Sequence, residues 1–270
     1  MSVTTMDGVP LSALGLSGNP EMDSACVPAA AAAGINWFFF YDNTSVNLIE
    51  GLAPVLQAER NGLFVATGSE SRDRRTLERY LDEACLRLGV DVIDLFLAEY
   101  VNPKDEMDAL LGHGGVLDLL NDWKQQGKIR YAGASAHDRD LAIQLIHSGK
   151  IDLLMHRYNM AHRKSEERVM PEAQRADVPI LGFTATRWGT LLAGHPEWNG
   201  AVPDAADCYR FVLANPAVLA TFTAPATVSH LHDNLAALES RTPTPDEREE
   251  WERYGALVSR RRNNCTKTLG

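Results

Sequence analysis

Residues 76–100 read TLERYLDEACLRLGVDVIDLFLAEY and carry the clearest indication of the fold class. The first half predicts a helix that ends at Gly89, because four apolar residues recur at helical spacing: Leu77, Leu81, Ala84 and Leu88. The second half, residues 92–98, is almost continuously apolar, which is typical of a strand covered on both faces. A helix followed by such a strand is the repeating unit of a parallel α/β sheet.

The same alternation continues in both directions from this unit. Apolar runs predict eight strands, at residues 11–15, 36–41, 63–67, 92–98, 129–132, 153–157, 180–184 and 218–223, with amphipathic segments between them. No G-x-G-x-x-G follows the first strand, which disfavours an open dinucleotide-binding sheet. We therefore expect an α/β fold of the (β/α)8 TIM-barrel type. It would be a single domain over residues 1–270, with a polar tail helix at about 241–270.

The charge, cysteine content and apolar runs of the chain limit the kinds of partner it can bind. The formal net charge is −10 and the only basic run lies in the tail, so we expect no nucleic-acid and no membrane partner. The four cysteines lack pairing or metal spacing, which indicates a reducing compartment. No apolar run approaches the roughly 20 residues of a membrane span. These features predict a soluble, cytoplasmic protein with a small-molecule substrate, and they leave the oligomeric state open.

Functional side chains of a parallel barrel gather where its strands end. The stretch GINWFFFYDNTS, residues 34–45, predicts an aromatic strand that alternates between barrel interior and helix layer and ends in Tyr41 and Asp42. Glu99 and Tyr100 follow the fourth predicted strand. The ends of later strands add five polar candidates: Ser135, His137, Arg157, Thr184 and Arg187. No candidate shows metal-ligand spacing, so no metal site is expected.

Several motifs, in order along residues 10–240, resemble those of the aldo-keto reductase superfamily. AAAGINWFFFYD (31–42) stands where that family has GINFFDTA, and LDEACLRLGVDVIDLFLAEY (81–100) resembles sLkrLgtDYiDLyllH. The most specific piece is QGKIRYAG (126–133), and PILGFTATRWGTLL (179–192) resembles the family's gviaySPLgrGlL. The resemblance implies a barrel that reduces a carbonyl with a nicotinamide cofactor. It also implies a catalytic tyrosine, lysine, aspartate and histidine.

The chain departs from the family at all four of these catalytic positions. Gly68 stands in place of the lysine and Glu99 in place of the histidine. The aspartate and tyrosine positions fall on Phe39 and Thr44. A glycine cannot lower the pKa of a tyrosine, and an ionised Glu99 would raise it.

We expect the catalytic residues to be Tyr41, Asp42 and Glu99, of which the first two are either relocated catalysts or remnants. A buried, protonated Glu99 could itself donate a proton or a hydrogen bond to a substrate oxygen. We expect the substrate to be contacted by Tyr100, His137 and Arg157.

The resemblance also implies cofactor contacts, with NADP and NAD both open. These fall on six residues: Ser135 for the carboxamide, Phe183 against the nicotinamide, Thr184 and Arg187 for the pyrophosphate, and Thr227 and Asn234 for the adenosine end. The segment around Thr227 offers no lysine or arginine for a 2′-phosphate, which makes a preference for NADP doubtful.

The expected function is an oxidoreductase of aldo-keto reductase type that acts on a small carbonyl or alcohol with a non-standard catalytic set. Two alternatives stay open. One is a non-redox enzyme, a lyase, dehydratase or isomerase that uses carboxylate acid–base chemistry on the same barrel. The other is a non-catalytic binding protein.

Overall fold

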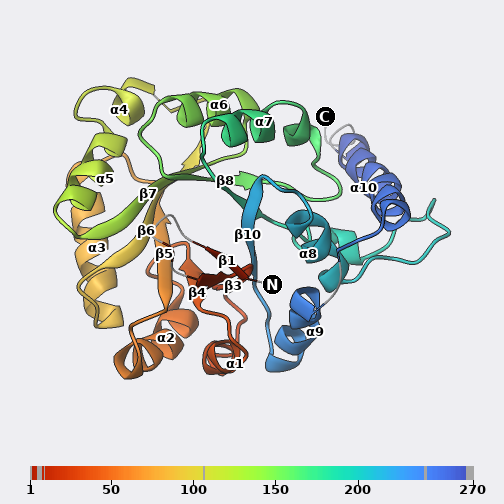
Figure 1. The fold of residues 1–270 in the computed structure, drawn as a ribbon, viewed down its shortest axis with the longest axis horizontal. Helices are drawn as coiled ribbons and strands as arrows, with labels where there is room; N and C mark the ends of the chain where they lie inside the picture. The colour runs from red at the N-terminus through yellow and green to blue at the C-terminus, as the bar shows by residue number, and fades with distance from the viewer. Residues whose placement is uncertain (1, 5–7, 9, 106, 240–241, 266–270) are drawn as a thin grey trace.

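The structure, a computed structural model, describes residues 2–4, 8, 10–105, 107–239 and 242–265. Eight parallel strands close into a barrel in the order β10-β3-β4-β5-β6-β7-β8-β9, with helices around it (Figure 1). The barrel strands are β3 (Leu14–Ser17), β4 (Trp37–Phe40), β5 (Phe64–Ser69), β6 (Ile93–Val101), β7 (Ile129–Ala136), β8 (Leu153–Arg157), β9 (Ile180–Phe183) and β10 (Val218–Thr223). The expected (β/α)8 TIM barrel is confirmed.

The helices follow the strands as the sequence predicts. They are α1 (Cys26–Ala32), α2 (Val46–Ala58), α3 (Arg74–Leu88), α4 (Met107–Leu111), α5 (Val116–Gln125), α6 (Arg139–His147), α7 (Val169–Arg175), α8 (Ala205–Leu213), α9 (Val228–Glu239) and α10 (Pro245–Cys265). The short helices α4, η1 (Lys164–Glu167) and η2 (Thr190–Leu192) lie in strand-to-helix connections and were not distinguished in the sequence. Among the described residues, no helix is both long and apolar enough to cross a membrane.

The apolar run at 11–15, expected to be one strand, is divided between two sheets. β2 (Pro10–Ser12) pairs antiparallel with β1 (Ser2–Thr4), and only β3 enters the barrel. Asn36 holds the junction, because its side-chain oxygen accepts from the backbone N–H of Ser12 at 2.8 Å. The resulting hairpin lies across the N-terminal opening of the barrel (Figure 1).

The aromatic strand β4 alternates as the sequence predicts. Trp37 and Phe39 belong to the cluster inside the barrel, whereas Phe38 and Phe40 pack in the outer core with the helices. Phe222 of β10 completes the inner stack, with ring centroids 5.2 Å from Trp37 and 5.3 Å from Phe39. Large rings therefore pack inside the barrel, and in this fold the groups that do chemistry stand at the C-terminal strand ends.

The same alternation places the candidate acid. On β6, Leu95 and Leu97 face the barrel interior, so Glu99 is the next inward residue. On β5, the inward residues Phe64 and Ala66 are followed by Gly68, which pairs with Leu97. Gly68 and Glu99 thus meet on the inner face at the C-terminal end of the barrel.

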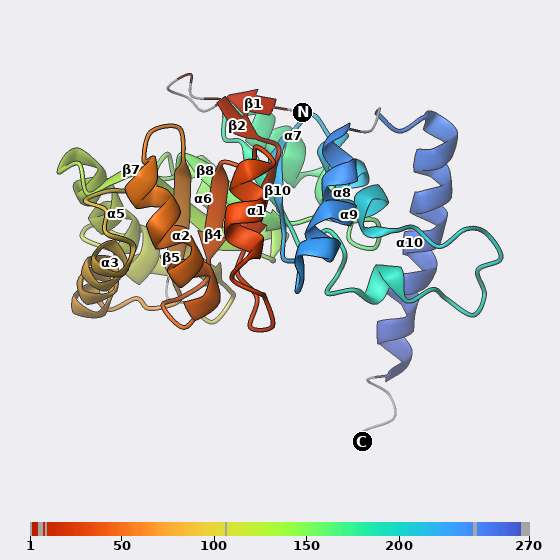
Figure 2. The same ribbon diagram turned by 90° about the horizontal axis from the view of Figure 1, so that it is seen from below.

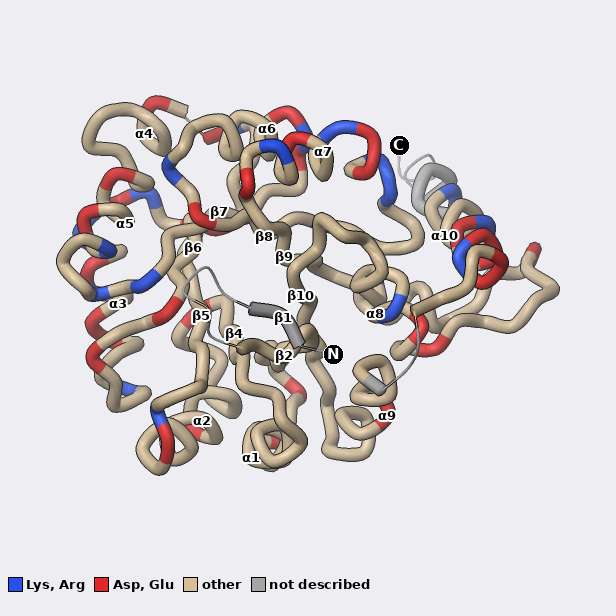
Figure 3. The backbone as a smooth tube through the Cα atoms, viewed as in Figure 1, with Lys and Arg blue, Asp and Glu red and all other residues tan. Residues whose placement is uncertain are grey.

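Helix α10 packs outside the helix layer, beyond α8 and α9 (Figure 2). Its Tyr254 hydroxyl donates to the Leu191 carbonyl at 2.7 Å. Gly255 lies so close to the loop after β8 that a Cβ there would be 2.1 Å from the Met160 carbonyl oxygen. Charges of both signs alternate along the helix (Figure 3), and Arg248 pairs with Glu166 of η1 at 2.9 Å. The polar tail expected from about residue 241 is therefore a docked helix from Pro245 onward.

Candidate active site

The inward side chains at the C-terminal strand ends form what we call the mouth of the barrel. They come from six consecutive barrel strands or the residue or two after them: Tyr41, Gly68, Glu99, Ser135 with His137, Arg157 and Phe183. Most of the residues expected to act at the site thus converge there, and Tyr100 adjoins them. The mouth holds a carboxyl, a phenol, an imidazole and a guanidinium around an aromatic surface.

Glu99 is the buried acid of the mouth. Only 5% of it is exposed, and its Oε1 has no hydrogen-bond partner among the described residues. Burial raises the pKa of this carboxyl well above its usual range, and the nearby charges of Glu70 and Asp42 raise it further. Arg72 opposes them, but its guanidinium donates to the main-chain oxygen of Glu99 at 2.9 Å. The environment therefore favours the protonated, neutral carboxyl.

Tyr41 stands at the rim of the mouth, 39% exposed, with its ring edge-on to Phe39 at 4.8 Å. Partial burial is the main cause that raises the pKa of its phenol, and the charge of Glu99 raises it further. Because no cation opposes these two effects, Tyr41 holds its proton more tightly than a free phenol. Glu99 is the better proton donor of the two.

A continuous chain of rings lies at the mouth. Phe183 lies between Tyr41, at 6.0 Å, and His137, at 5.5 Å, and His137 meets Tyr100 at 5.5 Å. Burial, and then the charge of Arg157, lower the pKa of His137 to about 4, so the imidazole is neutral. Tyr100 adopts a left-handed φ of 49°, a conformation that is uncommon for a bulky residue and concentrates at functional sites.

Asp42 does not join the mouth. It is exposed, and its Oδ1 accepts from the backbone N–H of Thr44 at 2.9 Å and from the Thr44 hydroxyl at 2.5 Å. This is a turn in which a short acid bonds the backbone two residues on. The structure thus gives Asp42 a local structural role and an electrostatic influence on Glu99.

The six expected cofactor residues are divided between the mouth and the outer loops. Ser135 and Phe183 lie at the mouth, where the Ser135 hydroxyl oxygen accepts from the Tyr100 N–H at 2.7 Å. The carbonyl of Thr184 accepts from Asn159 at 2.8 Å, and Thr227 accepts from the backbone of α9.

The remaining two cofactor candidates are buried in protein contacts. Arg187 is 5% exposed, and its guanidinium donates to the Val258 carbonyl of α10 at 2.7 Å. Asn234 is 8% exposed and donates to the Thr223 hydroxyl at 2.8 Å. The pyrophosphate role expected for Arg187 does not match this direction of its side chain.

Sequence reasoning missed Arg72, which holds the main chain of Glu99 and also pairs with Asp105 at 3.2 Å. The signal was the charged run Glu70–Asp73, which directly follows the inward end of β5. Tyr80 was missed as well; its hydroxyl lies 2.5 Å from the Thr67 hydroxyl, which in turn donates to the Phe40 carbonyl at 2.8 Å. Both residues fix the backbone that frames the mouth.

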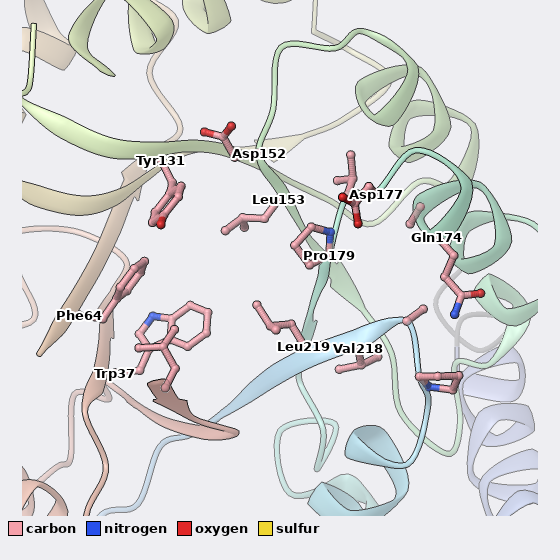
Figure 4. Close-up of a pocket in the computed structure, with 15 residues that line it drawn as sticks. Trp37, Phe64, Tyr131, Asp152, Leu153, Gln174, Asp177, Pro179, Val218 and Leu219 are labelled. Carbon is pink, nitrogen blue, oxygen red and sulfur yellow. The ribbon is translucent and has the colours of Figure 1, made fainter. Parts of the chain in front are cut away.

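A cavity of about 740 Å³ lies at the opposite, N-terminal end of the barrel (Figure 4). Its inner wall is made of Trp37, Phe64 and Tyr131, and none of the mouth residues lines it. Two acids line it: the exposed Asp177, and Asp152, which is already paired with Lys124 at 2.6 Å. In this fold the N-terminal face serves stability, so we place the candidate active site at the mouth.

Fold and site together define a (β/α)8-barrel protein whose functional groups stand at the C-terminal strand ends. The sequence profile of the aldo/keto reductase family matches residues 17–207. The chain belongs to the aldo/keto reductase family.

Named relatives and solved structures are similar to this chain. It is 28% identical to an L-glyceraldehyde 3-phosphate reductase of Escherichia coli O157:H7, over 51% of this chain and 39% of the relative. It is 24% identical to an NADH-specific methylglyoxal reductase of Escherichia coli K12, over 39% of this chain and 31% of the relative. These alignments therefore span well under half of each relative.

The fold extends over almost the whole chain. An aldo-keto reductase from Bacillus halodurans superposes in its apo form with a TM-score of 0.75, covering 94% of this chain and 95% of that one at 19% identity. Its holo form superposes with a TM-score of 0.73 at 18% identity, covering 94% of each chain. At these identities the likeness shows a shared fold.

Proposed function

We propose that this protein is an oxidoreductase that reduces a small carbonyl compound with NADH at the mouth of the barrel. Glu99 is the proton donor. The observation that carries the proposal is the Glu99 carboxyl on the inner face of the mouth, 5% exposed and with no hydrogen-bond partner for Oε1 among the described residues. Its raised pKa favours the protonated form that a proton donor needs. A buried polar atom without a partner is costly, so a substrate oxygen that accepts its proton is the expected partner.

The nicotinamide half of the cofactor fits the residues that remain available. The Ser135 oxygen accepts one hydrogen bond from the Tyr100 N–H, and its own O–H can still donate to a carboxamide. Phe183 is half-buried at the mouth and offers a ring next to that position. Bound NADH would supply the hydride.

The phosphate half of the site favours NADH over NADPH. Residues 218–239, which include the start of α9, contain no lysine or arginine to pair with a 2′-phosphate. The similarity to a methylglyoxal reductase named as NADH-specific supports the same preference. The names of the two reductase relatives also support a short carbonyl substrate.

The residues of this chain supply the proton and orient the substrate. Glu99 donates its proton to the carbonyl oxygen as that oxygen gains charge, and its carboxylate then takes a proton back from solvent. Burial drives the return, because an ionised carboxylate is poorly stabilised at this depth. The rings of Tyr41, Phe183, His137 and Tyr100 offer the surfaces against which a short carbonyl compound is oriented.

Fluorescence titration with NADH and NADPH, followed by turnover on short 2-oxoaldehydes and hydroxyaldehydes, tests the proposal. We expect NADH to bind more tightly than NADPH and to be consumed with the substrate. Glu99→Gln should keep NADH binding and lose turnover by roughly 10²–10⁴-fold, the usual contribution of a positioned acid. Failure of both dinucleotides to bind would contradict the oxidoreductase assignment.

One observation favours a second candidate, a non-redox enzyme that uses Glu99 in acid–base chemistry. The two arginines of residues 180–239 are both engaged within the protein, Arg187 with Val258 and Arg210 with Asp207 at 3.0 Å. Substrate consumption without any change in nicotinamide absorbance would identify this alternative, a lyase or isomerase.

A further inference from the structure

We propose that Gly68 is a positioning residue: the missing side chain at 68 creates the space in which the Glu99 carboxyl lies. A side chain at 68 and the observed Glu99 conformation are mutually exclusive. The link to catalysis rests on the proposed function, in which Glu99 donates a proton. The packing of Glu99 against Gly68 does not depend on that function.

The geometry is direct. A Cβ built on Gly68 would lie 2.7 Å from Cγ and 2.8 Å from Oε1 of Glu99. Both separations are shorter than carbon–carbon and carbon–oxygen contacts allow. The Glu99 side chain therefore folds across the α-carbon of Gly68, and even an alanine would displace it.

The register explains why the two residues compete. Gly68 pairs with Leu97 in the parallel β5–β6 ladder, so residue 99 lies one inward step further along the neighbouring strand. Side chains from 68 and 99 project into the same end of the barrel interior. When one is a glycine, the other can bend sideways and fill the shared volume.

A glycine instead of a lysine at position 68 also changes the charge around Glu99. The family resemblance puts a lysine at 68, and a lysine there would offer a cation to Glu99 and favour its ionised form. With glycine, five charged or titratable groups act on Glu99 or are acted on by it. They come from three places: Tyr41 and Asp42 after β4, Glu70 and Arg72 after β5, and Tyr80 of α3. Only one of these, Arg72, is a cation, so the glycine preserves a neutral acid.

A second contact at Gly68 must be separated from this effect. The same Cβ would lie 2.5 Å from the Leu97 carbonyl oxygen, which is backbone and independent of Glu99. A suitable control is Gly133→Ala, because a Cβ at that inward glycine of β7 would meet Leu97 and Leu153 and not Glu99. The Glu99→Ala background removes the side-chain conflict and leaves the backbone one.

The test measures the protonation of Glu99 by infrared spectroscopy of the full-length protein, with Glu99→Gln subtracted to assign the carboxyl band. We expect the pH at which the protonated band disappears to fall by about one unit or more in Gly68→Ala, because Glu99 is pushed toward solvent. It should stay unchanged in Gly133→Ala. An unchanged titration in Gly68→Ala would overturn the proposal.

Thermal unfolding supplies an independent readout. Gly68→Ala should lower Tm more in the Glu99 background than in the Glu99→Ala background, since the two residues are in contact. Equal losses would count against the proposal. If Gly68→Ala fails to fold but Gly68→Ala in the Glu99→Ala background folds, the conflict with the Glu99 side chain is supported. If neither variant folds, the proposal is overturned, because the clash with the Leu97 carbonyl alone then explains the loss. Turnover of Glu99→Gln tests the proposed function separately, so either idea can fail alone.

Discussion

At the scale of single residues, Glu99 couples stability to pH. Its folded pKa is raised, so between its unfolded and folded pKa values the folded protein binds more protons than the unfolded chain. The free energy of unfolding therefore falls as pH rises through this window. Glu99→Gln keeps a neutral group of similar shape, so its free energy of unfolding should not fall in this window. The stability it regains is about 1.4 kcal/mol for each pH unit between the unfolded and folded pKa values.

Urea unfolding from pH 5 to pH 9 checks this prediction. Glu99→Gln should gain stability over the wild type as pH rises and lose that advantage toward pH 5. Parallel curves for the two proteins would show that the carboxyl is ionised in the folded state. Glu50→Gln is a useful control, since Glu50 is exposed on α2 and is not among the charges that act on Glu99.

His156 couples stability to pH with the opposite sign. It is 1% exposed, its Nδ1 lies 2.6 Å from the Ala136 carbonyl, and its Nε2 lies 2.7 Å from the Ser165 hydroxyl. A neutral ring that donates to the first and accepts from the second satisfies both contacts. Burial, partly offset by the Ala136 hydrogen bond, lowers the pKa of His156 to about 4.

The unfolded chain therefore binds a proton at His156 below about pH 6.5, and stability falls as pH drops from there toward 4. The full loss is on the order of 3 kcal/mol. His156→Gln should be less stable than the wild type at pH 7 and should lose less on acidification to pH 4.5. Identical acid slopes in chemical denaturation would contradict a neutral buried histidine.

The position of Glu99 could be predicted from the sequence, because it directly follows an apolar strand. Its protonation could not, because that depends on rings and charges brought from other strands. The direction of the Arg187 side chain could not be predicted either. Its place in the loop suggested a phosphate contact, but the loop after β9 turns its guanidinium into α10.

At the scale of elements, strands were the easiest features to predict, since buried parallel strands leave long apolar runs. Strand β2 was hidden because residues 11–15 read as one apolar stretch, whereas Asn36 bonds Ser12 and divides it. The docking of α10 was also missed. Trp251, Tyr254 and Val258 are buried at helical spacing, but the many charges around them suggested a free polar tail.

The packing of α10 gives a prediction at this scale. Gly255→Val places atoms against the Met160 carbonyl, and overpacking of this kind costs roughly 1–3 kcal/mol. For a domain of this size we expect Tm to fall by roughly 2–10 °C. Ala256→Val, an exposed neighbour on the same helix, is the matched control and should change Tm little. Equal effects of the two substitutions would show that α10 does not dock as described.

At the scale of the whole molecule, the barrel separates stability from chemistry. The N-terminal end is lined by the aromatic rings of the inner cluster, and the hairpin lies across it, whereas the C-terminal mouth collects the polar groups. Family membership accounts for the barrel but not for the reaction, because the four catalytic positions that the resemblance implies fall on residues of other types: Phe39, Thr44, Gly68 and Glu99. The proposed chemistry therefore depends on a neutral acid, Glu99, where the family resemblance implies a histidine, next to Gly68 where it implies a lysine.

The negative charge of the whole molecule predicts that it does not bind nucleic acid or anionic membranes. With a formal net charge of −10, it should not bind duplex DNA or anionic vesicles at 150 mM salt. Electrophoretic mobility shift and vesicle sedimentation check this expectation. Saturable binding to either would contradict the expectation drawn from the net charge. Lys and Arg are interspersed with Asp and Glu along the described helices (Figure 3).

The pH dependence of kcat/KM for NADH-linked carbonyl reduction tests the central claim most directly. If a protonated Glu99 donates the proton, kcat/KM should fall about tenfold per pH unit above the pKa of Glu99, and this limb should vanish in Glu99→Gln together with most of the rate. A Glu99→Gln enzyme that keeps the wild-type rate and the wild-type pH profile would contradict it.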